Sequence, residues 1–175
     1  MEENSLKIAG IIRESITDGP GIRFVVFSQG CPHHCEGCHN METWSFEGGN
    51  EVSIDKILEA IDENGLINGV TFSGGEPFAQ PEGFLKLARE IRKRNLGLMI
   101  YTGYLFEDLV AMADDNINEL IHLADYIVDG PFVLEKRDIS LKFRGSSNQR
   151  IIDVKETEKI GNLSKIVLAK EYMVC

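Results

Sequence analysis

Residues 70–101 have the sequence VTFSGGEPFAQPEGFLKLAREIRKRNLGLMIY, and this stretch decides the fold class. The apolar run Val70–Phe72 is typical of a short buried strand. Apolar residues then recur at helical spacing over residues 84–91, and Gly97 marks the end of that helix. A second apolar run, Leu98–Tyr101, predicts another strand. Strand, helix and strand in this order predict a βαβ unit with two parallel strands in one sheet.

The same alternation extends along the rest of the chain. We expect further helices from the N-cap Ser53 to Gly65 and, in two pieces, between Leu105 and Leu123. Further strands are expected at Lys7–Ile12, Ile22–Phe27, Tyr126–Val128, Gln149–Ile152 and Ile166–Ala169. This rhythm predicts an α/β fold with mainly parallel strands.

The length of the chain limits the architecture. An eight-fold (β/α) barrel usually needs about 250 residues, whereas this chain has 175. We therefore expect residues 1–175 to form a single domain, a partial and laterally open (β/α) barrel. In such folds, ligands bind beyond the carboxyl ends of the parallel strands.

Composition and charge exclude several classes of protein. Hydrophobic residues make up 43% and charged residues 26% of the chain, as in ordinary globular domains. The net charge of −10 makes nucleic acid a poor main partner. No window reaches roughly 18 consecutive apolar residues, and the polar start of the chain is unlike a secretory signal. We therefore expect no membrane partner and a cytoplasmic location.

Three of the four cysteines lie within eight residues, directly after the predicted strand Ile22–Phe27. Cys31, Cys35 and Cys38 have the spacing C-x3-C-x2-C. In a chain without an export signal, this clustering indicates a metal or redox centre rather than a disulfide framework. Thiolates are soft ligands that suit zinc or iron–sulfur clusters. Three of them can hold three corners of a cubane cluster and leave the fourth iron without a protein ligand.

Two other centres remain open for this loop. A structural zinc ion needs a fourth ligand, which His33, His34 or His39 can supply. An electron-carrying ferredoxin needs four cysteines for each cluster, and Cys175, at the end of the chain, is a poor fourth ligand. Because three ligands leave an iron free for a substrate, the loop favours a catalytic cluster. Since only Cys175 remains beyond the loop, no auxiliary cluster is expected.

A glycine pair and a carboxylate stand where the predicted strand Val70–Phe72 ends. The residues that follow this strand are Ser73, Gly74, Gly75, Glu76 and Pro77. Glycines let the backbone approach a ligand closely, and exposed carbonyls with a carboxylate suit the amino group of an amino acid. The alternative is a tight βα turn that binds nothing.

Together, the cysteine loop and the G-G-E-P turn resemble the radical S-adenosylmethionine superfamily, which carries both motifs in this order. Asp18–Arg23 and Cys38–Asn40 further resemble the glycyl-radical-enzyme activases. One departure from the wider superfamily is Gly37, where an aromatic residue often packs on adenine. Further segments resemble the subgroup that acts on anaerobic ribonucleoside-triphosphate reductase, which also has glycine at that position: Gly30–His33, Thr43–Trp44, Tyr101–Tyr104, Val128–Phe132 and Arg144–Gln149.

The resemblance implies the cofactors and the residues that bind them. Cys31, Cys35 and Cys38 would hold a [4Fe-4S] cluster and take part in catalysis through it, with no separate acid or base. Thr102 and Asp129, at later strand ends, would contact the cofactor, with a helix cap and a turn carboxylate as the alternatives. The residues implied to hold S-adenosylmethionine are Gly37, Cys38 and His39 at the nucleoside and Ser73, Gly74, Gly75 and Glu76 at the methionine end.

The resemblance also implies a reaction and two partners. The reduced cluster would cleave S-adenosylmethionine, and the 5′-deoxyadenosyl radical would take a hydrogen atom from a glycine of anaerobic ribonucleoside-triphosphate reductase. A low-potential electron donor such as flavodoxin or ferredoxin is the second partner. Two alternatives stay open: an activase of another glycyl radical enzyme, of the pyruvate formate-lyase type, and a zinc-binding interaction module without catalysis.

Several other polar residues are expected to have supporting roles. Arg144–Gln149 is either a rim for the partner's glycyl segment or a solvated turn. Arg13, Arg23 and Trp44 are expected to support the cysteine loop rather than to act in catalysis. His122, which we place on an apolar helical face, is expected to be a core residue.

Overall fold

A computed structural model describes residues 4–163 and 165–173 of the chain, so Cys175 lies outside the described residues. Within these ranges, seven strands form one sheet with the order β3-β1-β2-β4-β5-β6-β7. The strands are β1 (Ser5–Ser15), β2 (Arg23–Ser28), β3 (Asn50–Ser53), β4 (Gly69–Gly74), β5 (Gly97–Tyr101), β6 (Tyr126–Asp129) and β7 (Arg150–Asp153).

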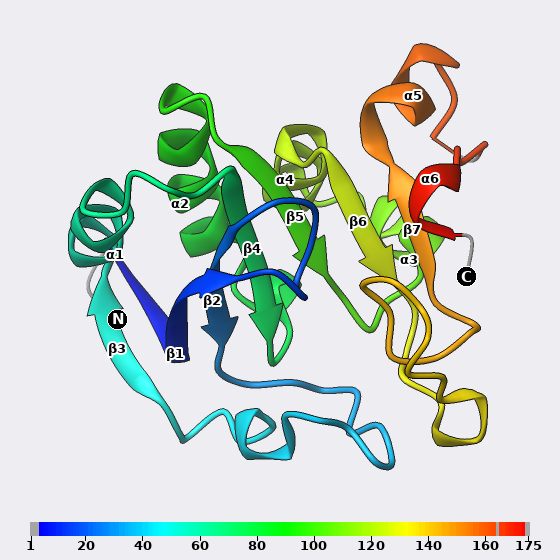
Figure 1. Ribbon diagram of the computed structural model, residues 1–175, viewed down its shortest axis with the longest axis horizontal. Helices are drawn as coiled ribbons and strands as arrows, with labels where there is room; N and C mark the ends of the chain where they lie inside the picture. The colour runs from blue at the N-terminus through cyan, green and yellow to red at the C-terminus, as the bar shows by residue number, and fades with distance from the viewer. Residues whose placement is uncertain (1–3, 164, 174–175) are drawn as a thin grey trace.

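The sheet is parallel in its centre and antiparallel at its sides. Strands β2, β4, β5 and β6 are parallel neighbours, whereas β1 pairs antiparallel with both β2 and β3, and β7 pairs antiparallel with β6. The predicted α/β class is confirmed, and the expectation of parallel strands holds for the central four. In Figure 1 the arrowheads of these four strands point toward one edge of the sheet, and the segment that follows β2 runs along this edge.

The α-helices are α1 (Ile54–Asp62), α2 (Pro81–Lys93), α3 (Phe106–Ala111), α4 (Asp115–Leu123), α5 (Val154–Lys159) and α6 (Lys170–Met173). Helices α1 to α4 lie where the sequence predicted them, whereas α5 and α6 were not predicted. Ser53 caps α1 by accepting a hydrogen bond from the Lys56 N–H at 3.4 Å, and Asp114 caps α4 and so explains the break before it. The predicted strand Ile166–Ala169 is wrong, because its pairing is limited to an isolated bridge between Leu168 and Ile152.

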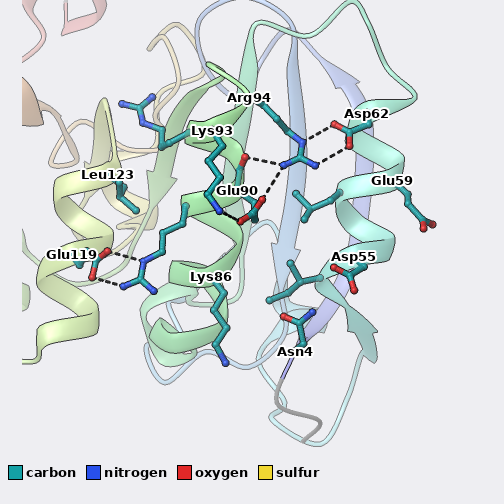
Figure 2. Close-up of a pocket in the computed structure, with 14 residues that line it drawn as sticks. Asn4, Asp55, Glu59, Asp62, Lys86, Glu90, Lys93, Arg94, Glu119 and Leu123 are labelled. Carbon is teal, nitrogen blue, oxygen red and sulfur yellow. Dashed lines mark hydrogen bonds and ion pairs between the residues drawn. The ribbon is translucent and has the colours of Figure 1, made fainter.

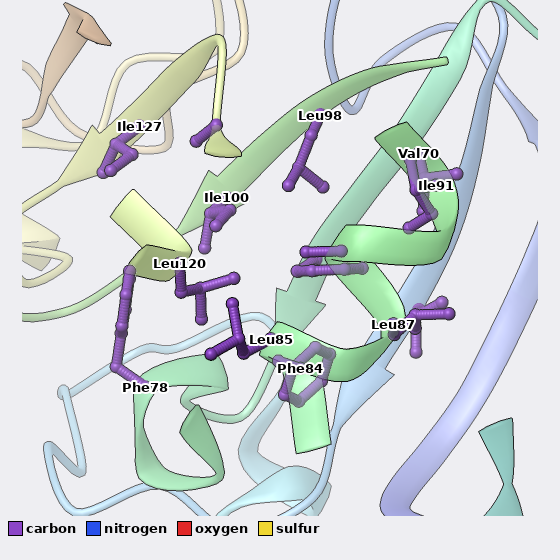
Figure 3. Close-up of a cluster of buried hydrophobic side chains, with 14 of the residues drawn as sticks. Val70, Phe78, Phe84, Leu85, Leu87, Ile91, Leu98, Ile100, Leu120 and Ile127 are labelled. Carbon is purple, nitrogen blue, oxygen red and sulfur yellow. The ribbon is translucent and has the colours of Figure 1, made fainter. Parts of the chain in front are cut away.

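The main core lies between the sheet and helix α2 (Figure 3). Phe84, Leu87 and Ile91 of α2 are fully buried, and they lie in one cluster with Val70 of β4 and Ile100 of β5. Burial of a side chain of this size stabilises the fold by about 1.5–3 kcal/mol. This packing joins β4 and β5 to α2 and so positions the residues at the carboxyl ends of these strands.

The opposite face of the sheet is covered near β5, β6 and β7. Met99, Val128 and Ile151 are fully buried there, and the rings of Phe143 and Tyr172 pack against them. Both faces of these strands are therefore covered within the described residues. None of the helices in this part of the chain has the length and apolar character needed to cross a lipid bilayer.

Arg23 and His122 do not have the roles that the sequence predicted for them. Arg23, at the start of β2, donates from Nη2 to the Val70 carbonyl at 2.6 Å and from Nε to Thr71 Oγ1 at 3.0 Å. Burial lowers its pKa to about 10. It thus lies at the amino-terminal edge of the parallel strands, opposite to the cysteine loop, and does not support that loop. His122 is exposed and pairs with Glu158, with Nδ1 2.6 Å from Oε1, so its prediction as a core residue is wrong.

Candidate functional site

The predicted site residues come from the carboxyl ends of the four parallel strands. The cysteine loop follows β2, the glycine turn ends β4, Thr102 follows β5 and Asp129 ends β6. The register pairs Ser28 with Gly74 and Tyr101 with Val128, so these ends lie along one edge of the sheet. Ligands of α/β folds bind at the carboxyl ends of the parallel strands. The cysteine loop and the glycine turn therefore lie at the edge of the sheet where a ligand is expected.

Backbone hydrogen bonds hold the cysteine loop in place. The Cys31 N–H donates to the Trp44 carbonyl at 3.1 Å, and the Cys38 N–H donates to the Cys35 carbonyl at 3.1 Å. The Trp44 ring stacks on His34 with ring centroids 4.8 Å apart. The supporting role predicted for Trp44 is thus confirmed. The same prediction for Arg13 is wrong, because its side chain is exposed and pairs with Glu63 at 3.1 Å.

A cavity of about 540 Å³ lies beside this loop, within the range of roughly 300–1,000 Å³ that is typical of ligand pockets. Gly37, Glu76 and Asp129 are not among the residues that line it. The predicted site residues that line it are Cys31, Cys35, Cys38, His39, Ser73, Gly74, Gly75 and Thr102. The fold therefore brings the cysteine loop, the glycine turn and the end of β5 around one space.

The three thiols of the loop are free and face this cavity. Burial raises the pKa of Cys31 and of Cys35, which favours the neutral thiol in this structure. Within the described residues, no three His, Cys, Asp or Glu side chains are close enough together to hold one metal ion. A cubane takes one thiolate at each of three irons, so its ligands do not converge on one point. The donor set and the cavity fit such a cluster.

The glycine turn packs directly on the start of the cysteine loop. The Gly75 N–H donates to the Ser28 carbonyl and the Glu76 N–H to the Gly30 carbonyl, each at 2.8 Å. A Cβ at position 75 would lie 2.5 Å from the Gly30 carbonyl oxygen, which is too close for any side chain. Gly75 is therefore required by the contact between the two segments.

Glu76 lies behind the wall of the cavity and is fully buried. Its Oε2 accepts hydrogen bonds from Thr102 Oγ1 at 3.0 Å and from the Gly103 N–H at 2.9 Å. His33 Nε2 lies 2.7 Å from the same oxygen, and the Phe78 N–H donates to Oε1 at 3.0 Å. The carboxylate is thus surrounded by donors of its own chain. Contact between Glu76 and S-adenosylmethionine stays a prediction.

Asp129 has a similar position at the end of β6. Its Oδ2 accepts a hydrogen bond from the Phe106 N–H at 2.8 Å, at the start of α3, and its Oδ1 accepts one from Arg150 Nε at 3.0 Å. The carboxylate is fully buried and lies outside the cavity lining. Its contacts are those of a helix cap and an ion pair, and contact with the cofactor stays a prediction.

Part of the cavity wall comes from residues that the sequence did not single out. Ile16 and Ile139 line the cavity and are 77% and 90% exposed. Asp18 and Phe132, from two segments that carry the family resemblance, line it as well. The two isoleucines are isolated apolar residues in polar turns, and this is the one sequence signal that marks them. From the predicted loop, Arg144, Gly145 and Gln149 line the cavity, and the Gly145 N–H donates to Gln149 Oε1 at 2.9 Å.

A larger hollow, of about 1100 Å³, lies between helices α1, α2 and α4 (Figure 2). Its walls carry paired charges: Arg94 Nε lies 2.7 Å from Asp62 Oδ1, and Arg89 Nη2 lies 2.6 Å from Glu119 Oε2. It contains none of the predicted site residues. Size alone therefore does not identify the functional site in this protein.

Comparisons with known proteins bear on the chemistry of the cavity. The sequence family described as a 4Fe-4S single cluster domain matches residues 17–152. An anaerobic ribonucleoside-triphosphate reductase-activating protein from Vibrio cholerae is 33% identical over 144 residues, which cover 78% of this chain and 90% of that protein. A protein of the same name from Escherichia coli K12 is 35% identical over 143 residues, which cover 77% and 90%. A pyruvate formate-lyase-activating enzyme from Clostridium pasteurianum is 35% identical over 130 residues, which cover 68% of this chain and 54% of that enzyme.

Proposed function

The chain belongs to the 4Fe-4S single cluster domain family and to the radical S-adenosylmethionine activating proteins of anaerobic ribonucleoside-triphosphate reductase, and we propose that it installs a glycyl radical on such a reductase. Its cofactors are a [4Fe-4S] cluster and S-adenosylmethionine. The observation that carries this proposal is the convergence of the three free cysteines and the glycine turn on one cavity.

The chemistry that the cluster supplies when bound is the one-electron cleavage of S-adenosylmethionine to methionine and a 5′-deoxyadenosyl radical, which takes a hydrogen atom from a glycine of the partner. Cys31, Cys35 and Cys38 would hold the cluster. The backbone of residues 73–75 would bind the methionine end, and residues 37–39 would bind the nucleoside. The cavity walls orient the cofactor and exclude water.

The partner protein reaches the cavity through its mouth. Ile16 and Ile139 line the cavity and are 77% and 90% exposed, so both side chains are accessible to a partner. The loop Arg144–Gln149 forms part of the same wall. We further propose that the sheet is a partial (β/α) barrel whose open side admits the glycyl segment. The electron donor and the cytoplasmic location stay predictions.

A second candidate function is activation of a pyruvate formate-lyase. The observation in its favour is the 35% identity to the enzyme from Clostridium pasteurianum. This chain spans about half of that enzyme, with 54% covered, whereas it spans 90% of the two reductase-activating proteins. The reductase is therefore the favoured partner.

Anaerobic reconstitution tests the metal centre and distinguishes the cluster from zinc. We expect about four iron and four sulfide per chain, a brown colour and no tightly bound zinc. Replacement of Cys31, Cys35 or Cys38 by Ala should abolish reductant-dependent formation of 5′-deoxyadenosine, whereas Cys175→Ala should leave it unchanged. A colourless protein that binds one zinc ion tightly would identify an interaction module instead.

A further inference from the structure

A contact between the partly buried His33 and the buried Glu76 joins the cysteine loop to the glycine turn. His33 lies between Cys31 and Cys35, and its Nε2 is 2.7 Å from Oε2 of Glu76. The side chain of Glu76 is fully buried, and that of His33 is 16% exposed. The contact therefore lies where water competes little with a hydrogen bond.

Glu76 connects this histidine to two other segments. Its Oε2 also accepts hydrogen bonds from Thr102 Oγ1 and the Gly103 N–H, and its Oε1 accepts one from the Phe78 N–H. A buried carboxylate is stable only with such donors around it. Because Oε2 already acts as an acceptor toward two groups, Nε2 of His33 carries the proton in this contact.

The space around the His33 ring is shaped to hold it in one position. Gly103 leaves room for the ring, since a Cβ at this position would lie 2.3 Å from Cδ2 of His33. Tyr104 packs edge-on against the ring, with centroids 4.4 Å apart and an interplanar angle of 77°. A segment at the end of β5 thus selects the orientation in which His33 reaches Glu76.

Glu76 forms hydrogen bonds with residues before and after Cys31, one of the proposed cluster ligands. Before Cys31, the Gly30 carbonyl accepts the Glu76 N–H at 2.8 Å. After Cys31, His33 contacts the Glu76 side chain. The position of Cys31 relative to the turn at Gly75 is therefore fixed from both directions. Cys31 and Gly75 line the same cavity.

We propose that His33 is a positioning residue for S-adenosylmethionine, which acts through Glu76 and holds the cysteine loop at a fixed distance from the glycine turn. The assignment rests on the proposed function, in which the amino acid end of the cofactor bridges the open iron and this turn. Such chelation needs the open iron and the glycine turn to lie at the correct separation from each other. A displacement of about 1 Å costs up to about 100-fold in rate. His33 also lines the cavity, but its Nε2 is engaged by Glu76, so we assign it a positioning role rather than that of a ligand.

Two substitutions at one position test the assignment. His33→Ala removes the donor, whereas His33→Gln keeps an N–H group at a similar distance from the backbone. His122→Gln is the matched control, because His122 is exposed, pairs with Glu158, and neither residue lines the cavity. The measurements are iron and sulfide content, the dissociation constant for S-adenosylmethionine on the loaded protein, and amide hydrogen exchange of the cluster-free protein.

For His33→Ala we expect iron and sulfide content near that of the wild type and a dissociation constant about 10-fold higher or more. Exchange over residues 74–78 should also become faster. His33→Gln should return the dissociation constant to within about threefold of the wild type, and His122→Gln should change nothing.

An unchanged dissociation constant in His33→Ala, or no recovery in His33→Gln, would overturn the assignment. Loss of iron in His33→Ala would also overturn it, since His33 would then be needed for the cluster itself. A wild type that binds no S-adenosylmethionine would refute the proposed function and this assignment together, and faster exchange in His33→Ala would then mark the contact as purely structural.

Discussion

Arg150 donates hydrogen bonds to both carboxylate oxygens of Asp129, across the antiparallel pair of β6 and β7. Asp129 is fully buried, whereas the Arg150 side chain is 27% exposed and also pairs with Glu107. These two carboxylates raise the pKa of Arg150, so its charge persists at any pH at which the protein is folded. The pair fixes the end of β6 and the start of α3 beside the cavity.

The first prediction follows from this pair. Arg150→Met should lower the free energy of unfolding by about 3 kcal/mol, because it leaves the buried Asp129 without its cationic partner. Arg13→Met is the matched control, since the Arg13–Glu63 pair is exposed, and it should cost less than about 1 kcal/mol. Urea unfolding under anaerobic conditions measures both. Equal losses in the two variants would contradict the role given to Asp129.

The second prediction concerns acid stability. Burial alone would raise the pKa of Asp125, but hydrogen bonds from Arg92, Lys155 and the Leu98 N–H outweigh it, and the pKa lies below its ordinary value. The stabilisation by Asp125 is therefore complete above about pH 4 and disappears as the pH falls through the lowered pKa. Asp125→Asn should cost about 2 kcal/mol at pH 7. In urea unfolding of the cluster-free protein, this difference should shrink below pH 4; a constant difference down to pH 2 would be inconsistent with it.

The third prediction concerns the glycine turn. Gly75→Ala should weaken binding of S-adenosylmethionine by about 10-fold or more, because the added methyl group collides with the Gly30 carbonyl and moves the turn away from the cysteine loop. Gly65→Ala is the control, since no atom lies within 4 Å of a Cβ at that position. Equilibrium dialysis against labelled S-adenosylmethionine measures both variants. Normal affinity in Gly75→Ala would show that the turn does not shape the site.

The fourth prediction concerns the mouth of the cavity. Ile139→Asp should raise the concentration of reductase needed for half-maximal activation by about 10-fold, because a charge replaces an apolar contact with the partner. Ile160→Asp is the control, because Ile160 is 50% exposed but lies outside the cavity lining. Titration with the reductase, followed by the glycyl radical signal, measures this. If both variants behave alike, the partner does not dock at Ile139.

Periodicity predicted the central strands and two of the three antiparallel strands, β1 and β7, but missed β3. The segment from β4 to β5 has strong strand and helix patterns, and its elements match the structure. Strand β3 was missed because Asn50–Ser53 contains a single apolar residue and is paired only through β1, more than 40 residues away in sequence. His122 was misplaced because its neighbours Ile121 and Leu123 are apolar, whereas the buried face of α4 contains Ile117, Leu120 and Ile121.

Spacing predicted the candidate cluster ligands, which the fold places around one cavity, but not the contacts that hold their loop in place. The cysteines and the glycine turn were found from sequence alone, since each motif is local. The contact between His33 and Glu76 joins residues 43 positions apart and depends on the register of β2 with β4. Arg23 lies near the cysteine loop in sequence, but β2 separates the two and places them at opposite edges of the sheet. Local patterns carry no information of this kind.

The most direct test mixes the reconstituted and reduced protein with S-adenosylmethionine and an anaerobic ribonucleoside-triphosphate reductase, and records the electron paramagnetic resonance spectrum together with 5′-deoxyadenosine. We predict a glycyl radical signal on the reductase and about one 5′-deoxyadenosine for each radical formed. Formation of 5′-deoxyadenosine without a signal on the reductase, but with one on a pyruvate formate-lyase, would contradict the proposed partner. The absence of both products from a fully loaded protein would contradict the proposed reaction.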